Sequence, residues 1–267
     1  TSAGVWTYTV DNTQAAVQGL AAGESLSETF TVGAVDGTTQ IISVSINGTN
    51  DRPVAVLDTG STFENAAVSE SDPASGLLSN DGDDDASDVL SIAQVNGSAG
   101  SVGASVAGSN GGTFVVHADG TWSFNPGSSF EDLAAGETRA TAVSYTVSDD
   151  SGTGNDEGTP VAFTVTVTGT NDAPVISVGS GSAAETLAET NAGLSVSDTL
   201  DVADVDTSNV VSASVQSVTH VSGPLGPIAA GDLAGLMSVG GGIGASVSAG
   251  TPARTGGESS LPSGTAR

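Results

Sequence analysis

The chain contains no lysine and no cysteine. Its 267 residues carry four arginines against 31 acidic side chains, which gives a formal net charge of −27 at pH 7. Nucleic acids and anionic lipid surfaces are bound by clustered Arg and Lys, so we expect no nucleic-acid partner. No apolar run reaches the length of about 18 residues that a membrane-spanning helix needs, so we expect no direct membrane insertion. Without cysteine, disulfides cannot stabilise the fold.

Large apolar side chains are also scarce. Leu, Ile, Val and Phe account for 59 residues, about 22% of the chain, and 32 of these are Val. That share lies just above the level of about 20% below which a packed core becomes implausible, and Val favours strands. Apolar residues alternate with a period of two at 143–147 and 163–167, without a helical stripe. We therefore predict an all-β chain with a thin core, which a metal that neutralises carboxylates would support.

One tetrapeptide, Gly-Thr-Asn-Asp, occurs at 48–51 and again at 169–172, and each copy closes an alternating apolar run. The two copies are 121 residues apart, and several downstream positions keep the same spacing. Such a common register indicates internal repeats. The matching pairs are Glu64 and Glu185, Asp83 and Asp204, Asp85 and Asp206, and Val89 and Val210.

The repeats divide the chain into four predicted segments. These are the C-terminal part of one repeat at 1–53, a complete repeat at 54–174, the N-terminal part of a third repeat at 175–250, and a disordered tail at 251–267. The chain opens in mid-pattern, as a piece of a longer protein would. About seven short strands in the complete repeat predict an antiparallel β-sandwich of immunoglobulin-like architecture. The dipeptide Asp119-Gly120 predicts a type I′ hairpin turn.

Five carboxylates fall between positions 81 and 88, in what must be a loop. Two such charges about 4 Å apart repel by roughly 4 kcal/mol at an effective dielectric constant of about 20. Ca²⁺ suits this loop, because it takes six to eight carboxylate or carbonyl oxygens with tolerant geometry. Asp83 and Asp85 can present their carboxylates on one side of an extended loop, and Asp204 and Asp206 repeat that spacing. The loop is not an EF-hand, because it lacks the Gly of that motif.

The run Gly-x-Trp-x-Tyr, Leu-Ala-Ala-Gly-Glu, Phe-Thr-Val and Gly-Thr-Asn-Asp-x-Pro resembles the VCBS repeat. That repeat is a cadherin-like, immunoglobulin-like module of giant bacterial surface and biofilm adhesins. The likeness covers about residues 1 to 220. It implies tandem sandwiches, of which the first and last are incomplete here, together with export to the cell surface and Ca²⁺ at the domain junctions.

Similarity to cadherins implies roles for the matching residues. The linker residues and the Asp-x-Asp pair would be junction ligands, the Glu of the first strand region would join them, and the acidic loop would contribute one further carboxylate. At the first junction the expected metal ligands are Asn50, Asp51, Glu64, Asp83, Asp85 and Asp88. At the second junction they are Asn171, Asp172, Glu185, Asp204 and Asp206.

The remaining candidate functional features of the sequence are weaker. The segment 149–156 could hold an ion, but an exposed polar turn is the preferred interpretation. His117 and His220 are isolated. Trp6 and Trp122 are interpreted as plugs between two sheets, with a sugar-stacking platform as the alternative. The sequence has no nucleophile elbow, phosphate loop, zinc spacing or Cys nucleophile, so we do not expect an enzyme.

The first functional hypothesis is a Ca²⁺-stiffened spacer and adhesion module on the bacterial cell surface. Its partners would be calcium ions and neighbouring repeats of the same chain, with surface polysaccharide or other adhesins as further candidates. The alternative is an accessory carbohydrate-binding module of a secreted enzyme. The two differ at Trp122, which the alternative requires to be exposed.

Overall fold

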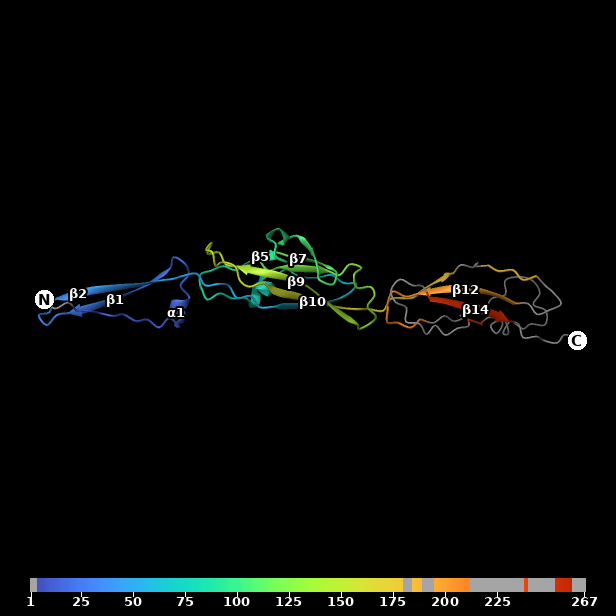
Figure 1. Cartoon of the computed structure of the whole chain (residues 1–267), viewed down its shortest axis with the longest axis horizontal. Coiled ribbons are helices and arrows are strands. Elements are labelled where there is room, and N and C mark those ends of the chain that lie inside the picture. Colours follow the sequence, from blue (N-terminus) through green and yellow to red (C-terminus); the bar gives the residue numbers. More distant parts are fainter. Residues whose placement is uncertain (1–3, 180–183, 189–194, 212–237, 240–252, 261–267) are drawn as a thin grey trace. The chain divides into compact units, whose positions relative to one another are not determined.

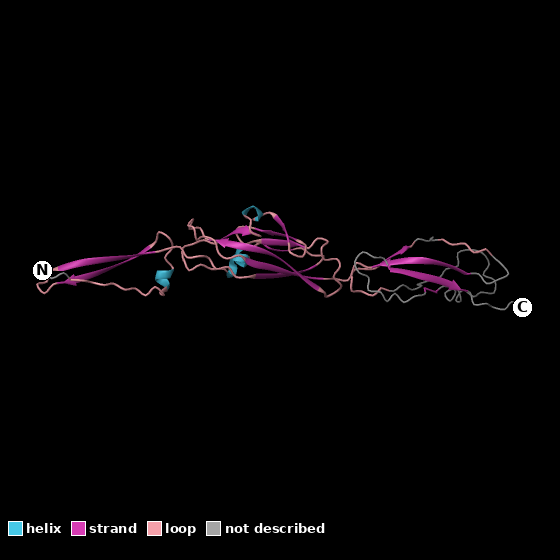
Figure 2. Ribbon diagram, viewed as in Figure 1, coloured by secondary structure: helices cyan, strands magenta, loops and turns pink. Residues whose placement is uncertain are grey.

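The structure is a computed structural model, and strands dominate it (Figures 1 and 2). This confirms the predicted all-β class. Among the described residues the one α-helix is the single turn α1 (Ala15–Gln18). The described residues are 4–179, 184–188, 195–211, 238–239 and 253–260.

The described chain divides into two compact units. One consists of residues 4–129 with 139–167, and the other of residues 130–138 with the described residues from 168 onward. The segment 130–138 joins the second unit through backbone hydrogen bonds, such as that from Gly169 N to Glu137 O at 2.8 Å. The repeat boundaries drawn from the sequence remain a prediction.

The first unit begins with a hairpin of β1 (Ser25–Gly33) and β2 (Thr39–Asn47). The two strands are antiparallel over their whole length. Tyr8 stacks on this hairpin, because its ring lies 5.5 Å from that of Phe30 and its hydroxyl donates to Glu28 Oε2 at 2.8 Å.

Two four-stranded sheets follow in the same unit, in the orders β3-β10-β9-β5 and β4-β8-β7-β6. They form the predicted sandwich. The strands are β3 (Asp58–Phe63), β4 (Val68–Glu70), β5 (Ser91–Val95), β6 (Ser105–Ala107), β7 (Thr113–Val116), β8 (Trp122–Asn125), β9 (Thr138–Ser148) and β10 (Val161–Thr168). Short 3-10 turns occupy Pro73–Ser75, Leu77–Asn80 and Ala99–Ser101.

Aromatic rings fill the space between these sheets. Phe114 of β7 lies 4.6 Å from Phe124 of β8 and 5.6 Å from Phe163 of β10, measured between ring centroids. Trp122 meets Phe163 edge-on at 4.6 Å. A Cβ at Gly60 would lie 3.2 Å from the Trp122 ring, so the indole packs directly on β3. Trp122 therefore plugs the sandwich as predicted, whereas Trp6, for which the same role was predicted, is 60% exposed.

The hairpin turn between β7 and β8 differs from the prediction. A type I′ turn needs positive φ at both central residues. Gly120 has φ of 84°, but Asp119 is not in the positive-φ region. Asp119 Oδ1 instead accepts hydrogen bonds from Thr121, from the backbone N at 3.0 Å and from Oγ1 at 2.7 Å. This side-chain cap stabilises a turn that the Asp-Gly signal alone does not identify.

The second unit contains a sheet of order β11-β12-β14-β13. Its strands are β11 (Val175–Val178), β12 (Ser195–Ala203), β13 (Ser238–Val239) and β14 (Ala253–Ser260). Residues 253–260, which the sequence places in the predicted disordered tail, form β14 and pair antiparallel with β12. The domain boundaries, the tail included, remain a prediction. Strand pairing uses backbone groups, so a segment without apolar alternation can still pair. His220 and the rest of the expected tail lie outside the described residues.

Tyr145 joins the first strand region of the sandwich to the loop that follows Leu77. Its hydroxyl lies 2.7 Å from Asp58 Oδ2, 2.9 Å from the Val56 carbonyl oxygen and 3.4 Å from Asp81 Oδ2. Burial raises the pKa of Tyr145, and burial also raises the pKa values of Asp58 and Asp81. The hydroxyl therefore gives two partly buried carboxylates a common donor at the entrance to the acidic loop.

Replacing Tyr145 by Phe is expected to lower the free energy of unfolding by about 1–3 kcal/mol, because buried acceptors lose their donor. Urea unfolding of the full chain, followed by tryptophan fluorescence, measures this change. Tyr8→Phe is the control, since it removes an exposed hydroxyl that binds Glu28. Equal unfolding midpoints for Tyr145→Phe and the unmodified chain would contradict the prediction.

Candidate metal centre

The acidic loop 81–88 begins beside the linker that leads into the sandwich. Val54 and Gly82 exchange two backbone hydrogen bonds, at 2.8 and 3.1 Å. On the other side of the linker, a Cβ at Gly158 would lie 2.6 Å from the Pro53 carbonyl oxygen. The linker is therefore in close contact with the start of the acidic loop and with the end of the β9–β10 connection.

The Asp-x-Asp pair binds the linker directly. Asp51 N donates to Asp85 Oδ2 at 2.6 Å, and Asp85 N donates to Asp83 Oδ1 at 3.1 Å. Asp85 is only 2% exposed. The structure thus brings Asp51, Asp83 and Asp85 together, as the sequence spacing predicts.

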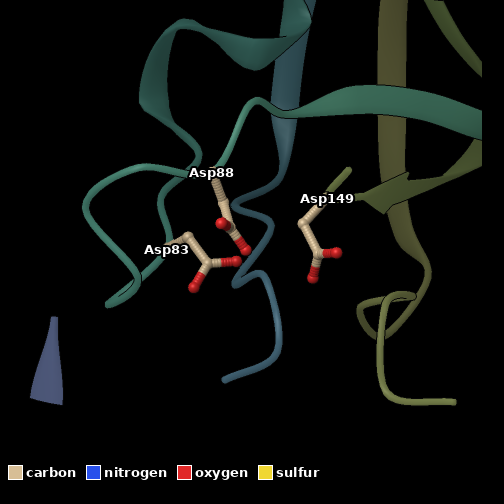
Figure 3. A group of neighbouring side chains, drawn as sticks. All are labelled: Asp83, Asp88 and Asp149. Carbon is tan, nitrogen blue, oxygen red and sulfur yellow. The ribbon is translucent and has the colours of Figure 1, made fainter. Parts of the chain in front are cut away.

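Three carboxylates meet next to this pair. One oxygen each of Asp83, Asp88 and Asp149 lies within 4.8 Å of the others. Figure 3 shows these side chains directed into the same space, two from the acidic loop and Asp149 from the residue after β9. Ca²⁺ binds oxygen at about 2.3–2.6 Å, so ligands of one ion lie up to about 5 Å apart. The spacing of the three oxygens fits one such ion.

The charges of this cluster oppose one another. Burial raises the pKa of Asp83, and the negative charges of Asp85, Asp149 and Asp51 raise it further. Burial likewise raises the pKa of Asp88, with added repulsion from Asp85 and Asp149. The carboxylates of the cluster therefore repel one another when all of them are ionised.

Buried oxygens without hydrogen bonds form a second line of evidence. Buried polar atoms are nearly always paired, because leaving one unpaired costs about 1–3 kcal/mol. A divalent cation bound to such oxygens would satisfy them and offset the repulsion. In the part of the chain that the structure describes, the unpaired oxygens of this cluster are Asn50 Oδ1, Asp83 Oδ2, Asp85 Oδ1 and Asp88 Oδ2.

Asn50 connects the linker to the far side of the cluster. Its Nδ2 donates to the Asp51 carbonyl at 2.6 Å, to Asp149 Oδ2 at 3.1 Å and to the Asn155 carbonyl at 3.2 Å. All donor capacity of the amide is used on the protein, and Oδ1 is left for the cluster. Asn50 is therefore placed as a neutral oxygen ligand.

Asp149 is the residue that the sequence analysis did not select. The segment 149–156 was interpreted as an exposed polar turn, whereas Asp149 is 6% exposed and accepts hydrogen bonds from Ser151 N at 2.9 Å and from the Ser151 hydroxyl. The position of Asp149 follows from the pairing of β5 with β9. Ser91 of β5 lies opposite Ser148, the last residue of β9, so Asp149, which follows β9, lies beside the end of the acidic loop.

Glu64 does not lie with the other predicted ligands of the first set. Asp58, at the start of β3, accepts a hydrogen bond from Asn80 beside the acidic loop, at 3.2 Å. Glu64 follows the other end of β3, six residues later, and is 1% exposed. At about 3.3 Å per residue, that is about 20 Å along the strand. The structure therefore separates Glu64 from Asp83, because β3 runs away from the acidic loop.

The second set repeats the backbone pattern of the first within the second unit. Asp172 N donates to Asp206 Oδ2 at 2.9 Å, and Asp206 N donates to Asp204 Oδ1 at 3.1 Å. Asn171 Nδ2 donates to the Asp172 carbonyl at 2.6 Å, as Asn50 does to Asp51. The predicted ligand Glu185 is exposed. Four of the five predicted residues are thus brought together.

Residues 50–169 match the sequence model of the bacterial cadherin-like domain. The matched residues include all strands of the sandwich from β3 onward. They also include Asp51 and Asp85, which form the hydrogen bond between the linker and the acidic loop. The bacterial cadherin-like domain is an all-β structural or adhesive module, and the family is typically not enzymatic. The narrower likeness to the VCBS repeat remains a prediction. A comparison with curated proteins finds no match. Within the described part of the chain, helices long and apolar enough to span a membrane are absent.

In buffer with excess chelator, Asp83→Asn is expected to raise the free energy of unfolding by about 1 kcal/mol, or the melting temperature by a few degrees. The substitution removes one of several mutually repelling carboxylates and keeps an oxygen that can accept from Asp85 N. Differential scanning calorimetry of the full chain measures the shift.

Asp84→Asn is the matched control for this prediction, because it makes the same charge change at an exposed position of the same loop. A lower melting temperature for Asp83→Asn than for Asp84→Asn, both in chelator, would show that the carboxylates of the cluster do not repel.

Proposed function

We propose that the chain is a calcium-binding structural and adhesion module of a large secreted bacterial surface protein. It acts as a rigidified spacer in cell adhesion or biofilm formation. The observation that carries this proposal is the set of buried, unpaired oxygens on Asn50, Asp83, Asp85 and Asp88, in the cluster that also binds the linker. The match of residues 50–169 to the bacterial cadherin-like domain supports the structural part of the role.

The residues that would hold Ca²⁺ at the first linker are Asp83, Asp85, Asp88 and Asp149, with Asn50 Oδ1 as a neutral ligand. The ion supplies positive charge to a group of carboxylates that otherwise repel. Asp85 holds the linker through Asp51 N, and Asn50 holds it to the β9–β10 connection. Pro53 restricts the linker further, because its ring fixes φ. These contacts convert a short connection into a stiff one.

The affinity that this role requires is modest. Extracellular calcium-binding modules bind with dissociation constants of about 10⁻⁴ to 10⁻³ M. Such a site would be filled outside the cell and empty at cytosolic calcium levels, so the module would become stiff only after export. Neighbouring repeats of the same chain are the direct partners in this role, and surface polysaccharides or other adhesins are candidates for the distal contact.

The carbohydrate-binding alternative required Trp122 at the surface. Its ring instead packs edge-on against Phe163 and on β3 at Gly60. Trp122 is therefore partly buried and packed into the sandwich, which favours the spacer role over the carbohydrate-binding alternative.

Calcium is expected to raise the stability of the full chain. At about 10 mM Ca²⁺ and a dissociation constant of about 0.1 mM, binding to the folded state alone adds about 2.7 kcal/mol. Calorimetric melts in calcium and in chelator measure this, and small-angle scattering follows the accompanying loss of flexibility.

Mg²⁺ at the same concentration controls for ionic strength and is expected to act less, because it demands a tighter octahedral shell and retains its waters. Asp83→Asn and Asp204→Asn should each remove part of the calcium effect. Identical melting temperatures and identical scattering dimensions in calcium and in chelator would refute the proposal.

A further inference from the structure

The two acidic sets share a backbone pattern but differ at one side chain. Asp51, Asp83 and Asp85 correspond to Asp172, Asp204 and Asp206 at the constant spacing of 121 residues. The same spacing places Asn209 at the position of Asp88. Over these four positions the first set has four carboxylates and the second has three.

The substituted side chain has a different role in each set. Asp88 Oδ2 is a buried oxygen with no hydrogen bond among the described residues, and its carboxylate belongs to the cluster with Asp83 and Asp149. Asn209 Nδ2 donates to Asp206 Oδ2 at 2.8 Å and to Asn171 Oδ1 at 3.3 Å. Asn209 thus occupies Asn171 Oδ1, whose counterpart Asn50 Oδ1 has no hydrogen bond among the described residues. It also adds a second hydrogen bond to Asp206 Oδ2, which, like its counterpart Asp85 Oδ2, already accepts from the linker N–H.

This difference has two consequences for a cation. Over the four matched positions the second set offers one negative charge less, and ligand charge is a main determinant of calcium affinity. Its Asn171 Oδ1 and Asp206 Oδ2 also have to give up hydrogen bonds from Asn209 before they can serve fully as ligands. Both effects weaken binding at the second set.

The linkers themselves also differ in their side-chain contacts, which is a separate observation. Arg52 donates to Asn155 Oδ1 from Nη2 at 2.8 Å and from Nε at 3.2 Å. Asn155 Nδ2 in turn donates to the Asn50 carbonyl at 3.5 Å. The counterpart of Arg52 is Ala173, which has no side-chain donor. The first linker therefore has side-chain contacts that Ala173 cannot make.

We propose that the two linkers are unequal, and that the linker at 48–53 binds a divalent cation more tightly than the linker at 169–174. The second linker is then the calcium-sensitive hinge of this chain, because it loses its ion first as calcium falls. This inference rests on the proposed function, since it assumes that both sets take calcium.

Isothermal titration of the full chain with Ca²⁺ tests the affinities. Two classes of sites are expected, with dissociation constants that differ about tenfold or more, in line with the effect of ligand charge. Asn209→Asp should bring the weaker class closer to the stronger one, and Asp88→Asn should weaken the stronger class about tenfold. Asp84→Asn, the exposed neighbour in the acidic loop, should leave both classes unchanged.

The order in which the two linkers bind calcium can be followed by distances between spin labels. Site-specific labelling is possible because the chain has no native cysteine. Paired spin labels at cysteines that replace Ser43 and Ser128 report on the first linker, and labels at Ser128 and Ser208 report on the second. All three serines are exposed. At intermediate calcium, the first distance distribution should be narrow while the second is still broad.

The results distinguish failure of the proposed inequality from failure of the proposed function. Equal affinities in the unmodified chain, an unaltered weaker class in Asn209→Asp, or simultaneous narrowing of both distance distributions would overturn the inequality and leave calcium binding intact. Absence of calcium binding, with distance distributions that do not respond to calcium, would overturn the proposed function itself.

Discussion

Repulsion between buried carboxylates is the constraint on which the linker region depends. Asp83, Asp88 and Asp149 approach within 4.8 Å, while the fully buried Asp85 is occupied by the linker N–H. Backbone and side-chain donors satisfy only part of these oxygens, and the remainder point at one another. Holding such a group together lowers the stability of the fold unless the repulsion is offset. The same carboxylates also hold the linker, so the electrostatics of the cluster and the order of the linker are coupled.

The thin core explains why this problem arises at one end of the sandwich. Strands β7 to β10 are covered by alternating apolar residues and interlocking rings, and they need no further support. The first part of the repeat is different, since 3-10 turns and loops occupy most of 73–90 and Leu77 is its one fully buried large apolar side chain. Polar contacts take over there, through the Tyr145 hydroxyl and the carboxylates of the acidic loop. A cation would therefore act where apolar burial is weakest.

The sequence predicted the elements that depend on periodicity and the pairs that depend on register. Alternation identified β9 and β10, and the spacing of 121 residues identified the contacts of Asp85 with Asp51 and of Asp206 with Asp172. Asp149 and Glu64 were misjudged for one reason: their positions depend on which strands are neighbours and in which direction each runs. That information comes from tertiary pairing, such as Ser91 opposite Ser148, and a single sequence does not contain it in readable form. The hairpin at Asp119 was predicted, but its turn type was not, because a side-chain hydrogen bond to Thr121 accompanies a backbone geometry other than the one that the Asp-Gly dipeptide usually indicates.

Comparison of the two acidic sets distinguishes two properties, the geometry of the linker and the charge of the acidic set. The hydrogen bond from the linker N–H to the second Asp of the pair is the same in both, at 2.6 and 2.9 Å, although the charge of the set differs by the change from Asp88 to Asn209. Linker geometry therefore depends on the Asn-Asp and Asp-x-Asp backbone contacts, whereas in the proposed calcium-binding role the cation affinity would depend on the side chains around them. Because these contributions are made by different atoms, a tandem array can keep one joint geometry throughout and still vary the stiffness of each joint by single substitutions.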